Sequence, residues 1–284
     1  MKTLKVGICG WGNVATGLYK AINNNADAIE FNSGASLSIE VIGARRDNPK
    51  CDSGKTLIER DIFAVLDHDI DVVVELIGGV EVARDLILKA IKKKKHVVTA
   101  NKAVIYHHGD EIFKSAKDYG VRVLFESSVC AGTPIIKLLK EELAANKVSK
   151  ISGMLNGTSN FILSNMEEGG DFDSTLKLAQ EEGYAEPDPT FDIEGMDAAH
   201  KIGILSSLAF ATSLPPSDVQ IEGITKIKKS DFYYAMDMGY TVKHLAVAKL
   251  HKGTVELRAH PALINLKSHL ANLKGVRNGM EIDT

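Results

Sequence analysis

Residues 4–15 read LKVGICGWGNVA, an apolar run that ends in a glycine-rich turn. The run over residues 4–9 is typical of a buried parallel strand. The turn has the G-x-G-x-x-G/A spacing and opens an amphipathic segment, and its glycines allow backbone amides to approach a pyrophosphate closely. The same string also occurs in ordinary strand-to-helix turns, but its place in an alternating β/α domain favours dinucleotide binding. The residues expected to contact the cofactor here are Gly10, Gly12, Asn13 and Val14.

The first half of the chain alternates apolar runs with amphipathic segments, as β-α-β units do. The expected strands cover residues 4–9, 39–44, 72–76, 96–99 and 121–126. The expected helices, with apolar residues three and four apart, cover residues 14–22, 82–92 and 109–119. The sequence therefore predicts an α/β fold whose dinucleotide-binding domain, residues 1–130, is a Rossmann-type doubly wound parallel sheet.

After Glu126 the pattern becomes mixed and predicts an α+β catalytic and dimerisation domain over residues 131–284. Its expected elements are a helix over 133–144, a strand over 148–155, a helix from 158, helices over 173–182 and 194–211, and two strands within 240–259. Pro187 and Pro189 exclude regular structure from the segment 183–192. Gly253 is expected in the turn between the last two strands, which we expect to serve in homodimer contact.

Composition narrows the class of protein. A chain of 284 residues with 44% hydrophobic and 25% charged residues fits two folded domains. The net charge of −3 gives no footprint for nucleic acid, and no apolar stretch approaches the roughly 20 residues of a membrane span. Three widely spaced cysteines and an N-terminus without room for a leader indicate a cytoplasmic protein.

The second expected strand ends in Arg45 and Arg46 instead of an acidic residue. An acidic residue there would select the ribose hydroxyl of NAD, whereas arginines suit a 2′-phosphate. The alternative is that both are solvent-facing loop charges. We therefore expect NADPH, with NADH as the alternative cofactor.

The densest polar grouping in the chain covers residues 179–201, which read AQEEGYAEPDPTFDIEGMDAAHK. Its prolines constrain the loop, and either Asp192 or Glu194 is expected at the N-terminus of the next helix. Asp197 and Lys201 are four residues apart on one helix face. For a random helix, such a pair is an exposed ion pair worth a few tenths of a kcal/mol.

This long stretch resembles the signature of the homoserine dehydrogenase family at every specified position. Further segments that resemble the same family, in the same order, are the glycine loop and residues 75–79, 99–102, 126–134 and 156–160. The resemblance covers nearly the whole chain. It implies reversible, NAD(P)H-dependent reduction of L-aspartate 4-semialdehyde to L-homoserine, in the biosynthesis of threonine, methionine and isoleucine.

The resemblance also implies roles for single residues. Lys201 and Lys102 would flank the reacting carbonyl, with Asp197 supporting Lys201. An ammonium there can stabilise the charge that develops on the aldehyde oxygen and can donate a proton, and like-charge repulsion between two ammonium groups favours that proton transfer. A role for Lys102 in positioning the cofactor is equally compatible. The implied substrate-binding residues are Glu186 and Asp192 for the ammonium group, and Tyr184, Gly157 and Thr158 for the carboxylate or hydroxyl; Thr158 could otherwise be a helix cap.

Two further sites follow from the same resemblance. The remaining cofactor-binding residues would be Gly78, Thr99, Asn101 and Lys102. A sodium ion would be held by Glu126 and the backbone carbonyls of Val129, Ala131 and Thr133.

Other functions remain as alternatives at this point. A related two-domain enzyme such as an aspartate dehydrogenase would share the glycine loop but not the 179–201 signature, and a catalytically silent regulatory protein could use the same fold. For His200 a packed or solvated ring is favoured over a metal ligand, and for Cys130 a buried structural thiol. Family members continue past the position of Thr284 with a glycine-rich segment and a helix that returns to the nucleotide domain, a segment expected to be absent here.

Overall fold

The computed structural model describes residues 2–284. Contacts divide the chain into two compact units, Met1–Gly132 and Thr133–Thr284. The limit expected from the sequence lies two residues earlier, between residues 130 and 131. Each unit is described by itself below.

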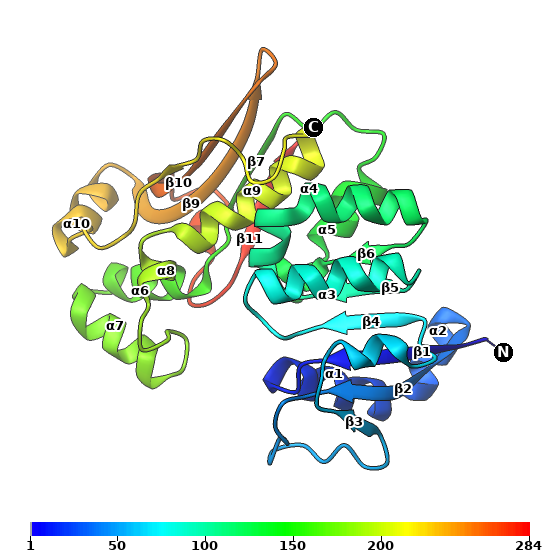
Figure 1. Cartoon of the computed structure of the whole chain (residues 1–284). Helices are drawn as coiled ribbons and strands as arrows, with labels where there is room; N and C mark the ends of the chain where they lie inside the picture. Colours follow the sequence, from blue (N-terminus) through cyan, green and yellow to red (C-terminus); the bar gives the residue numbers. More distant parts are fainter. Residues whose placement is uncertain (1) are drawn as a thin grey trace. The chain divides into compact units, whose positions relative to one another are not determined.

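The first unit is built on a six-stranded sheet in the order β3-β2-β1-β4-β5-β6, with every neighbouring pair parallel (Figure 1). Its strands are β1 (Lys2–Cys9), β2 (Ala35–Gly43), β3 (Leu57–Glu59), β4 (Val72–Glu75), β5 (His96–Thr99) and β6 (Val123–Leu124). This is the strand order of doubly wound dinucleotide-binding sheets, which bind ligands where the order reverses. The fold class predicted for the first half of the chain is confirmed.

Helices connect these strands as β-α-β units require. They are α1 (Asn13–Asn24), α2 (Ala26–Ser33), α3 (Glu81–Lys92) and α4 (Lys102–Tyr119), with the short 3-10 helices η1 (Ala64–Asp67) and η2 (Glu126–Ser128). Ala15 of α1 packs against Ile8, Ile42 and Val74 in the core of the sheet. The small third residue of the glycine motif is therefore fully buried, as close packing of helix on strand demands.

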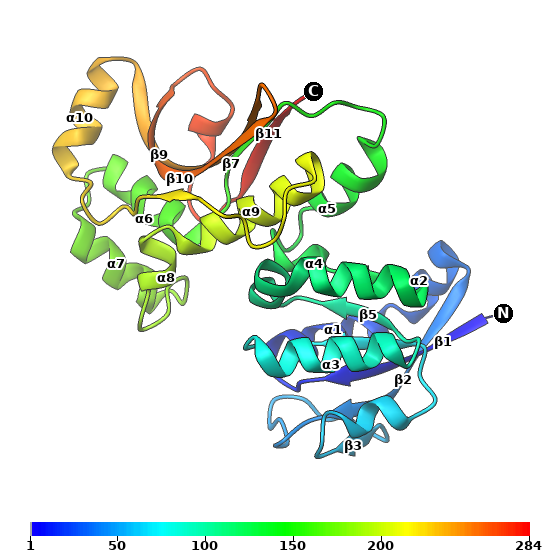
Figure 2. The same ribbon diagram turned by 45° about the horizontal axis from the view of Figure 1, so that its top comes forward.

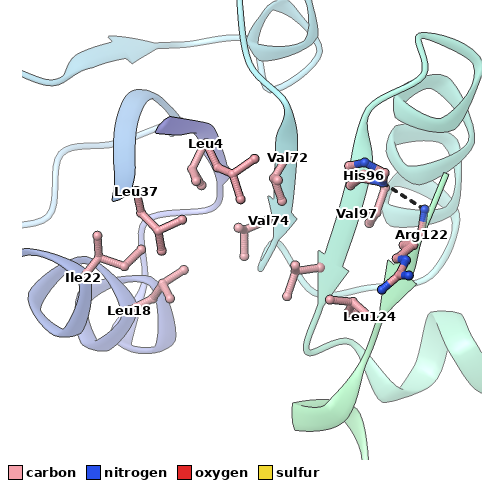
Figure 3. A pocket seen from close by; sticks show the side chains of 12 residues that line it. Leu4, Leu18, Ile22, Leu37, Val72, Val74, His96, Val97, Arg122 and Leu124 are labelled. Carbon is pink, nitrogen blue, oxygen red and sulfur yellow. Dashed lines mark hydrogen bonds between the residues drawn. The ribbon is translucent and has the colours of Figure 1, made fainter. Parts of the chain in front are cut away.

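The face of the sheet on which α1 packs is only partly covered. A groove of about 430 Å³ opens on this face. In Figure 3, Leu18 and Ile22 of α1 lie on one side of it and Leu124 of β6 on the other, with Val72 and Val74 between them. Leu124 is 54% exposed. Parallel sheets are ordinarily buried on both faces, so this groove is an exposed apolar patch on the first unit.

The second unit contains a five-stranded sheet in the order β11-β7-β9-β10-β8. Its strands are β7 (Lys150–Met154), β8 (Gln220–Ile221), β9 (Tyr240–His251), β10 (Thr254–Asn265) and β11 (Gly279–Asp283). Only the β10–β8 pair is parallel. The β9–β10 hairpin turns at Lys252 and Gly253, both with positive φ, which confirms the turn expected there.

The second unit also contains helices, of which α6, α9 and α10 pack on this sheet (Figure 2). They are α5 (Ile135–Lys137), a π-helical turn η3 (Leu138–Glu142), α6 (Gly157–Glu167), α7 (Phe172–Glu181), α8 (Thr190–Ile193), α9 (Met196–Phe210), α10 (Lys229–Asp237) and the 3-10 helix η4 (Leu270–Asn272). The long α9 contacts β7, β9 and β10, while α6 and α10 contact β9. The mixture of helices with a mainly antiparallel sheet confirms the predicted α+β class.

Several local expectations were wrong. The helix expected over residues 133–144 is a single turn, α5, followed by the π turn η3. Helix α4 begins at Lys102 and not at residue 109, because Asn101 caps it and its β-branched first turn, Val104 and Ile105, is buried. The short or partly exposed elements α2, β3, β8, α10 and β11 were missed, since they carry weak periodicity. The exclusion of regular structure from residues 183–192 was wrong at its end, because helix α8 starts at Thr190 directly after its N-cap Pro189, where a proline does not interrupt a helix.

None of the helices within residues 2–284 combines the length and apolar character that crossing a bilayer requires.

We predict that the groove of Figure 3 binds small apolar probes. Leu124→Glu should lower the fluorescence of an environment-sensitive hydrophobic dye, because a carboxylate placed there is costly to desolvate. Since Leu124 is 54% exposed, the melting temperature should change little.

The control is Phe31→Ser, which removes a side chain that is 89% exposed and does not line the groove. Equal dye fluorescence in wild type and Leu124→Glu would show that the groove does not take up apolar ligands.

Candidate active site

The glycine loop connects β1 to α1 at the centre of the first sheet. Gly10 has φ +106°, and a Cβ there would lie 2.4 Å from the carbonyl oxygen of Leu76. Gly12 is the N-cap of α1 in an extended conformation, and a Cβ at Gly12 would meet no atom within 4 Å. Gly10 is thus needed for the turn itself, whereas Gly12 leaves open space before the first amides of α1, where a pyrophosphate fits.

A cavity of about 440 Å³ opens at this loop. Its lining includes Gly10, Trp11, Gly12, Arg45, Arg46 and Ile77. Arg45 and Arg46 are exposed and follow the end of β2 at Gly43. Arg60 supports the same segment, because its guanidinium donates to the carbonyl of Ala44 at 3.3 Å and to Asp47 at 2.7 Å. The cavity therefore has two exposed arginines in its lining beside the N-terminus of α1.

A buried carboxylate joins the loops that follow β4 and β5. Glu75 is fully buried; its Oε1 accepts from the backbone N–H of Ile77 at 2.9 Å and its Oε2 accepts from the Thr99 hydroxyl at 2.5 Å. The Thr99 hydroxyl oxygen in turn accepts from the N–H of Asn101 at 2.9 Å. Both loops are thereby held at the carboxyl edge of the sheet, where ligands bind in this fold.

The Asn101 side chain also connects the loops that follow β4 and β5. Its Oδ1 caps α4 by accepting from Val104 N, and its Nδ2 donates to the carbonyl of Gly79 at 2.7 Å. Lys102 follows directly as the first residue of α4. The structure thus brings the expected cofactor residues Gly78, Thr99, Asn101 and Lys102 onto two connected loops, although the Thr99 side chain lies beneath the surface.

The expected sodium ligands lie on the segment that begins at η2. Glu126 is the first residue of η2 and Val129 is the C-cap of η2. Ala131 and Thr133 follow, outside any regular helix. A carboxylate and successive carbonyls are the ligand types that a hard cation requires. Within residues 2–284, no group of three or more His, Cys, Asp or Glu residues is arranged to hold a metal ion.

In the second unit, Lys201 and Asp197 form a buried ion pair on α9. Their atoms Nζ and Oδ2 are 2.8 Å apart, and their side chains are 14% and 9% exposed. Lys201 Nζ also donates to the carbonyl of Leu155 at 2.6 Å. The exposed ion pair considered from the sequence is therefore wrong: two bonds fix this ammonium in a site of low solvent access, where electrostatic interactions are strong.

Asn156 joins this pair to Asp192. Its Nδ2 donates to Asp192 Oδ1 at 2.7 Å and to Asp197 Oδ2 at 2.9 Å, and its Oδ1 accepts from Ser159 N as the cap of α6. Thr158 is inside α6, so the alternative that Thr158 is the cap is wrong. The carboxylates of α8 and α9 thus meet at one amide at the start of α6.

The loop over residues 183–189 borders this cluster. The Thr158 hydroxyl donates to the carbonyl of Tyr184 at 2.7 Å and also lies 3.3 Å from Asp192 Oδ2. Gln180 Nε2 lies 3.3 Å from the carbonyls of both Glu186 and Pro187, which holds the loop to α7. Glu186, expected to bind the substrate ammonium, is exposed on this loop.

The turn into α9 depends on a residue that the sequence did not single out. Gly195, with φ +84°, is the N-cap of α9, so neither Asp192 nor Glu194 caps it as expected. His244 of β9 packs on Gly195, where a Cβ would lie 3.0 Å from His244 Nε2. Burial lowers the pKa of His244, which leaves its ring neutral against the Glu222 carbonyl.

The remaining histidine and cysteine expectations concern packing. His200 is buried and makes an edge contact with Phe191, with ring centroids 5.2 Å apart. Cys9, Cys51 and Cys130 are buried and form no disulfide within residues 2–284, which confirms the burial expected for Cys130.

Comparison with known proteins identifies the family. The model of the family described as "Homoserine dehydrogenase" matches residues 134–284, and that described as "Homoserine dehydrogenase, NAD binding domain" matches residues 10–126. The chain belongs to the homoserine dehydrogenase family. Curated homoserine dehydrogenase from Pseudomonas aeruginosa is 50% identical to it over 285 residues, which cover 100% of this chain and 66% of that protein.

Solved homoserine dehydrogenases have the same fold. The crystal structure from Thiobacillus denitrificans superposes with a TM-score of 0.95 at 43% identity and covers 99% of this chain and 66% of its own. The crystal structure of S. aureus homoserine dehydrogenase at pH 6.0 superposes with a TM-score of 0.87 at 35% identity. The match covers 100% of this chain and 73% of that chain. The chain thus spans about two thirds of the length of the first curated relatives, at 66%.

Three residues of this homoserine dehydrogenase family member were missed as site residues from the sequence: Asn156, Glu75 and Arg60. Asn156 and Glu75 lie in segments that carry the family resemblance, and an asparagine before Gly-Thr-Ser signals a helix cap. Their bonds to Asp192 and Thr99 span 36 and 24 residues, so no local pattern identifies those partners. Arg60 follows β3, a strand too short to be predicted.

We predict that the two glycines of the loop respond differently to alanine. Gly12→Ala should retain the wild-type melting temperature, since its Cβ meets no protein atom within 4 Å, but should weaken dinucleotide binding by filling the pyrophosphate space. Gly10→Ala should lower the melting temperature, because of its positive φ and the Leu76 carbonyl. Trp11, the only tryptophan of the chain, lies between them and reports binding by fluorescence.

A titration of Trp11 fluorescence with NADPH, beside thermal unfolding without ligand, measures both effects. Wild-type affinity in Gly12→Ala would contradict the assignment of this loop to the pyrophosphate.

Proposed function

We propose that this chain carries homoserine dehydrogenase activity, the reversible NAD(P)H-dependent reduction of L-aspartate 4-semialdehyde to L-homoserine. The observation that carries the proposal is the buried ammonium of Lys201, held by Asp197 and by the Leu155 carbonyl beside a second carboxylate, Asp192. Family membership supports the same reaction. An aspartate dehydrogenase or a silent binding protein would not need this arrangement.

In the proposed reaction, Lys201 acts at the aldehyde oxygen. A bound reduced nicotinamide supplies the hydride. As negative charge develops on the oxygen, the Lys201 ammonium stabilises it and donates a proton, while Asp197 holds the ammonium in place. We assign Lys102 to the same oxygen; a role in cofactor positioning would instead make Lys102→Ala weaken NADPH binding without lowering turnover at saturation.

The substrate is an amino acid, so its charges need opposite partners. We propose that Asp192 and Glu186 bind its ammonium group, and that Tyr184 with the first amides of α6, at Gly157 and Thr158, binds its carboxylate or hydroxyl. The Thr158 hydroxyl is already donated to Tyr184 O, which supports a backbone role for this residue.

The first unit is proposed to bind the dinucleotide and the second to bind substrate and form a homodimer through its sheet. The open space at Gly12 and the cavity lined by Arg45 fit a dinucleotide with a 2′-phosphate. The proposal therefore favours NADPH over NADH. Glu126 with the carbonyls of Val129, Ala131 and Thr133 is proposed as a sodium site. A cytoplasmic location is part of the proposal and accords with three cysteines that form no disulfide within residues 2–284.

We predict that Arg45→Ala reduces discrimination between the two cofactors. Loss of one guanidinium from the 2′-phosphate should lower kcat/KM for NADPH about tenfold, because a charged hydrogen bond contributes about 1.5 kcal/mol, and should leave NADH nearly unchanged. Lys50→Ala, which removes another exposed cation of the same loop, is the control. An unchanged preference for NADPH in Arg45→Ala would remove this residue from cofactor selection.

We predict that Lys201→Ala loses about 10²- to 10⁴-fold in kcat, the usual contribution of a positioned general acid. NADPH oxidation by aspartate semialdehyde, followed by absorbance, measures this. The matched control is Lys177→Ala, which removes the lysine of an exposed i,i+4 pair on α7. Normal turnover in Lys201→Ala would overturn the mechanism, and failure of the wild-type chain to turn over would overturn the function.

A further inference from the structure

The side chain of Asn156 is almost completely buried, with the residue 6% exposed, and every one of its polar hydrogens is used. Its Oδ1 accepts from the backbone N–H of Ser159 at 2.7 Å. A backbone N–H can only donate, so the amide orientation is fixed and Nδ2 must face the two carboxylates. One N–H goes to Asp192 and the other to Asp197.

This arrangement places two carboxylates around one neutral donor. Like charges this close repel each other, and buried carboxylates are stable only when their oxygens accept hydrogen bonds. The Lys201 ammonium neutralises Asp197 by bonding the same Oδ2 atom that Asn156 bonds. Asp192, by contrast, contacts two neutral groups, the Asn156 amide at Oδ1 and the Thr158 hydroxyl at Oδ2, so its negative charge is available to a cationic ligand.

We infer that Asn156 is a positioning residue for the reaction, because its amide holds Asp192, which faces the substrate ammonium, at a set distance from the Asp197–Lys201 pair. This inference rests on the proposed function. Asn156 touches no reacting atom; it sets the spacing between the subsite for the ammonium group and the lysine that protonates the aldehyde oxygen. Misplacement of such groups by about 1 Å can cost on the order of 100-fold in rate.

Two substitutions separate this role from helix capping. Serine and aspartate both cap helices as well as asparagine does, so Asn156→Ser and Asn156→Asp should keep α6 intact. Asn156→Ser removes both amide donors without adding charge. Asn156→Asp removes them and adds a third carboxyl beside Asp192 and Asp197.

We expect Asn156→Ser to raise KM for aspartate semialdehyde and lower kcat, with kcat/KM reduced about tenfold or more, since charge-assisted hydrogen bonds are lost. At pH 8 the reduction in Asn156→Asp should be larger, because of repulsion. Affinity for NADPH, followed by Trp11 fluorescence, should stay at the wild-type value in both. Asp171→Ser, which exchanges the cap of α7, is the matched control and should leave all parameters unchanged.

The pH profile gives a signature that capping alone cannot produce. A protonated carboxyl can donate to a neighbouring carboxylate as the amide does, so the activity of Asn156→Asp relative to wild type should rise as the pH falls toward 5. The charged groups that contact the Asn156 cluster are Asp192 of α8 with Asp197 and Lys201 of α9. These groups, and His244 of β9, which interacts electrostatically with Asp197, are also present in Asn156→Ser, so the activity of that variant relative to wild type should stay flat with pH.

Wild-type kcat/KM in Asn156→Ser, or equal and flat relative pH profiles for both variants, would overturn the inference. A crystal structure of Asn156→Ser decides the positioning independently of turnover: the Asp192 carboxylate should move away from its wild-type place, and an unmoved carboxylate would contradict the inference. Failure of the wild-type chain to reduce aspartate semialdehyde would instead count against the proposed function.

Discussion

The second unit depends on how the carboxylate of Asp197 is satisfied once it is buried. Removing an ion from water costs several kcal/mol, and a single partner seldom offsets that cost. Asp197 Oδ2 accepts from both Lys201 and Asn156, while Lys201 also donates to the Leu155 carbonyl. The end of β7, the start of α6 and the first turns of α9 must therefore meet in one arrangement, and the same arrangement brings Asp192 close.

The first unit also contains a buried carboxylate that accepts hydrogen bonds from two segments. Glu75, at the end of β4, is fully buried and satisfied by the Ile77 amide and the Thr99 hydroxyl. Because Thr99 also accepts from the Asn101 amide, the carboxylate holds the start of α4, and with it Lys102. In each unit a buried carboxylate helps to hold a helix that carries a lysine of the proposed mechanism, α4 with Lys102 and α9 with Lys201.

The same parallel sheet that brings these loops together leaves an apolar surface behind it. α1 covers one side of the face, and the groove between α1 and Leu124 stays open over β4. Burial of apolar surface contributes about 25 cal/mol per Å², so covering this groove would stabilise the folded state of the unit. The function proposed for the carboxyl edge does not involve it.

The sequence by itself determined the parts that local patterns encode. The glycine spacing after a strand specified the dinucleotide loop, alternation of strands and helices specified the doubly wound sheet, and the four-residue spacing of Asp197 and Lys201 specified their pairing. Weakly periodic elements such as α10 and β11 lacked such a pattern, and α4 was predicted seven residues too short because its first turn is β-branched.

Only the tertiary structure decided what those local parts meet. It buried the Asp197–Lys201 pair, which on the helix alone is a surface ion pair of small energy. It also brought Asn156 to Asp192 and Asp197, 36 and 41 residues away. The physical reason is that helix and strand periods fix which face a residue occupies, whereas its partner depends on how separate elements pack, and one sequence carries no local record of that packing.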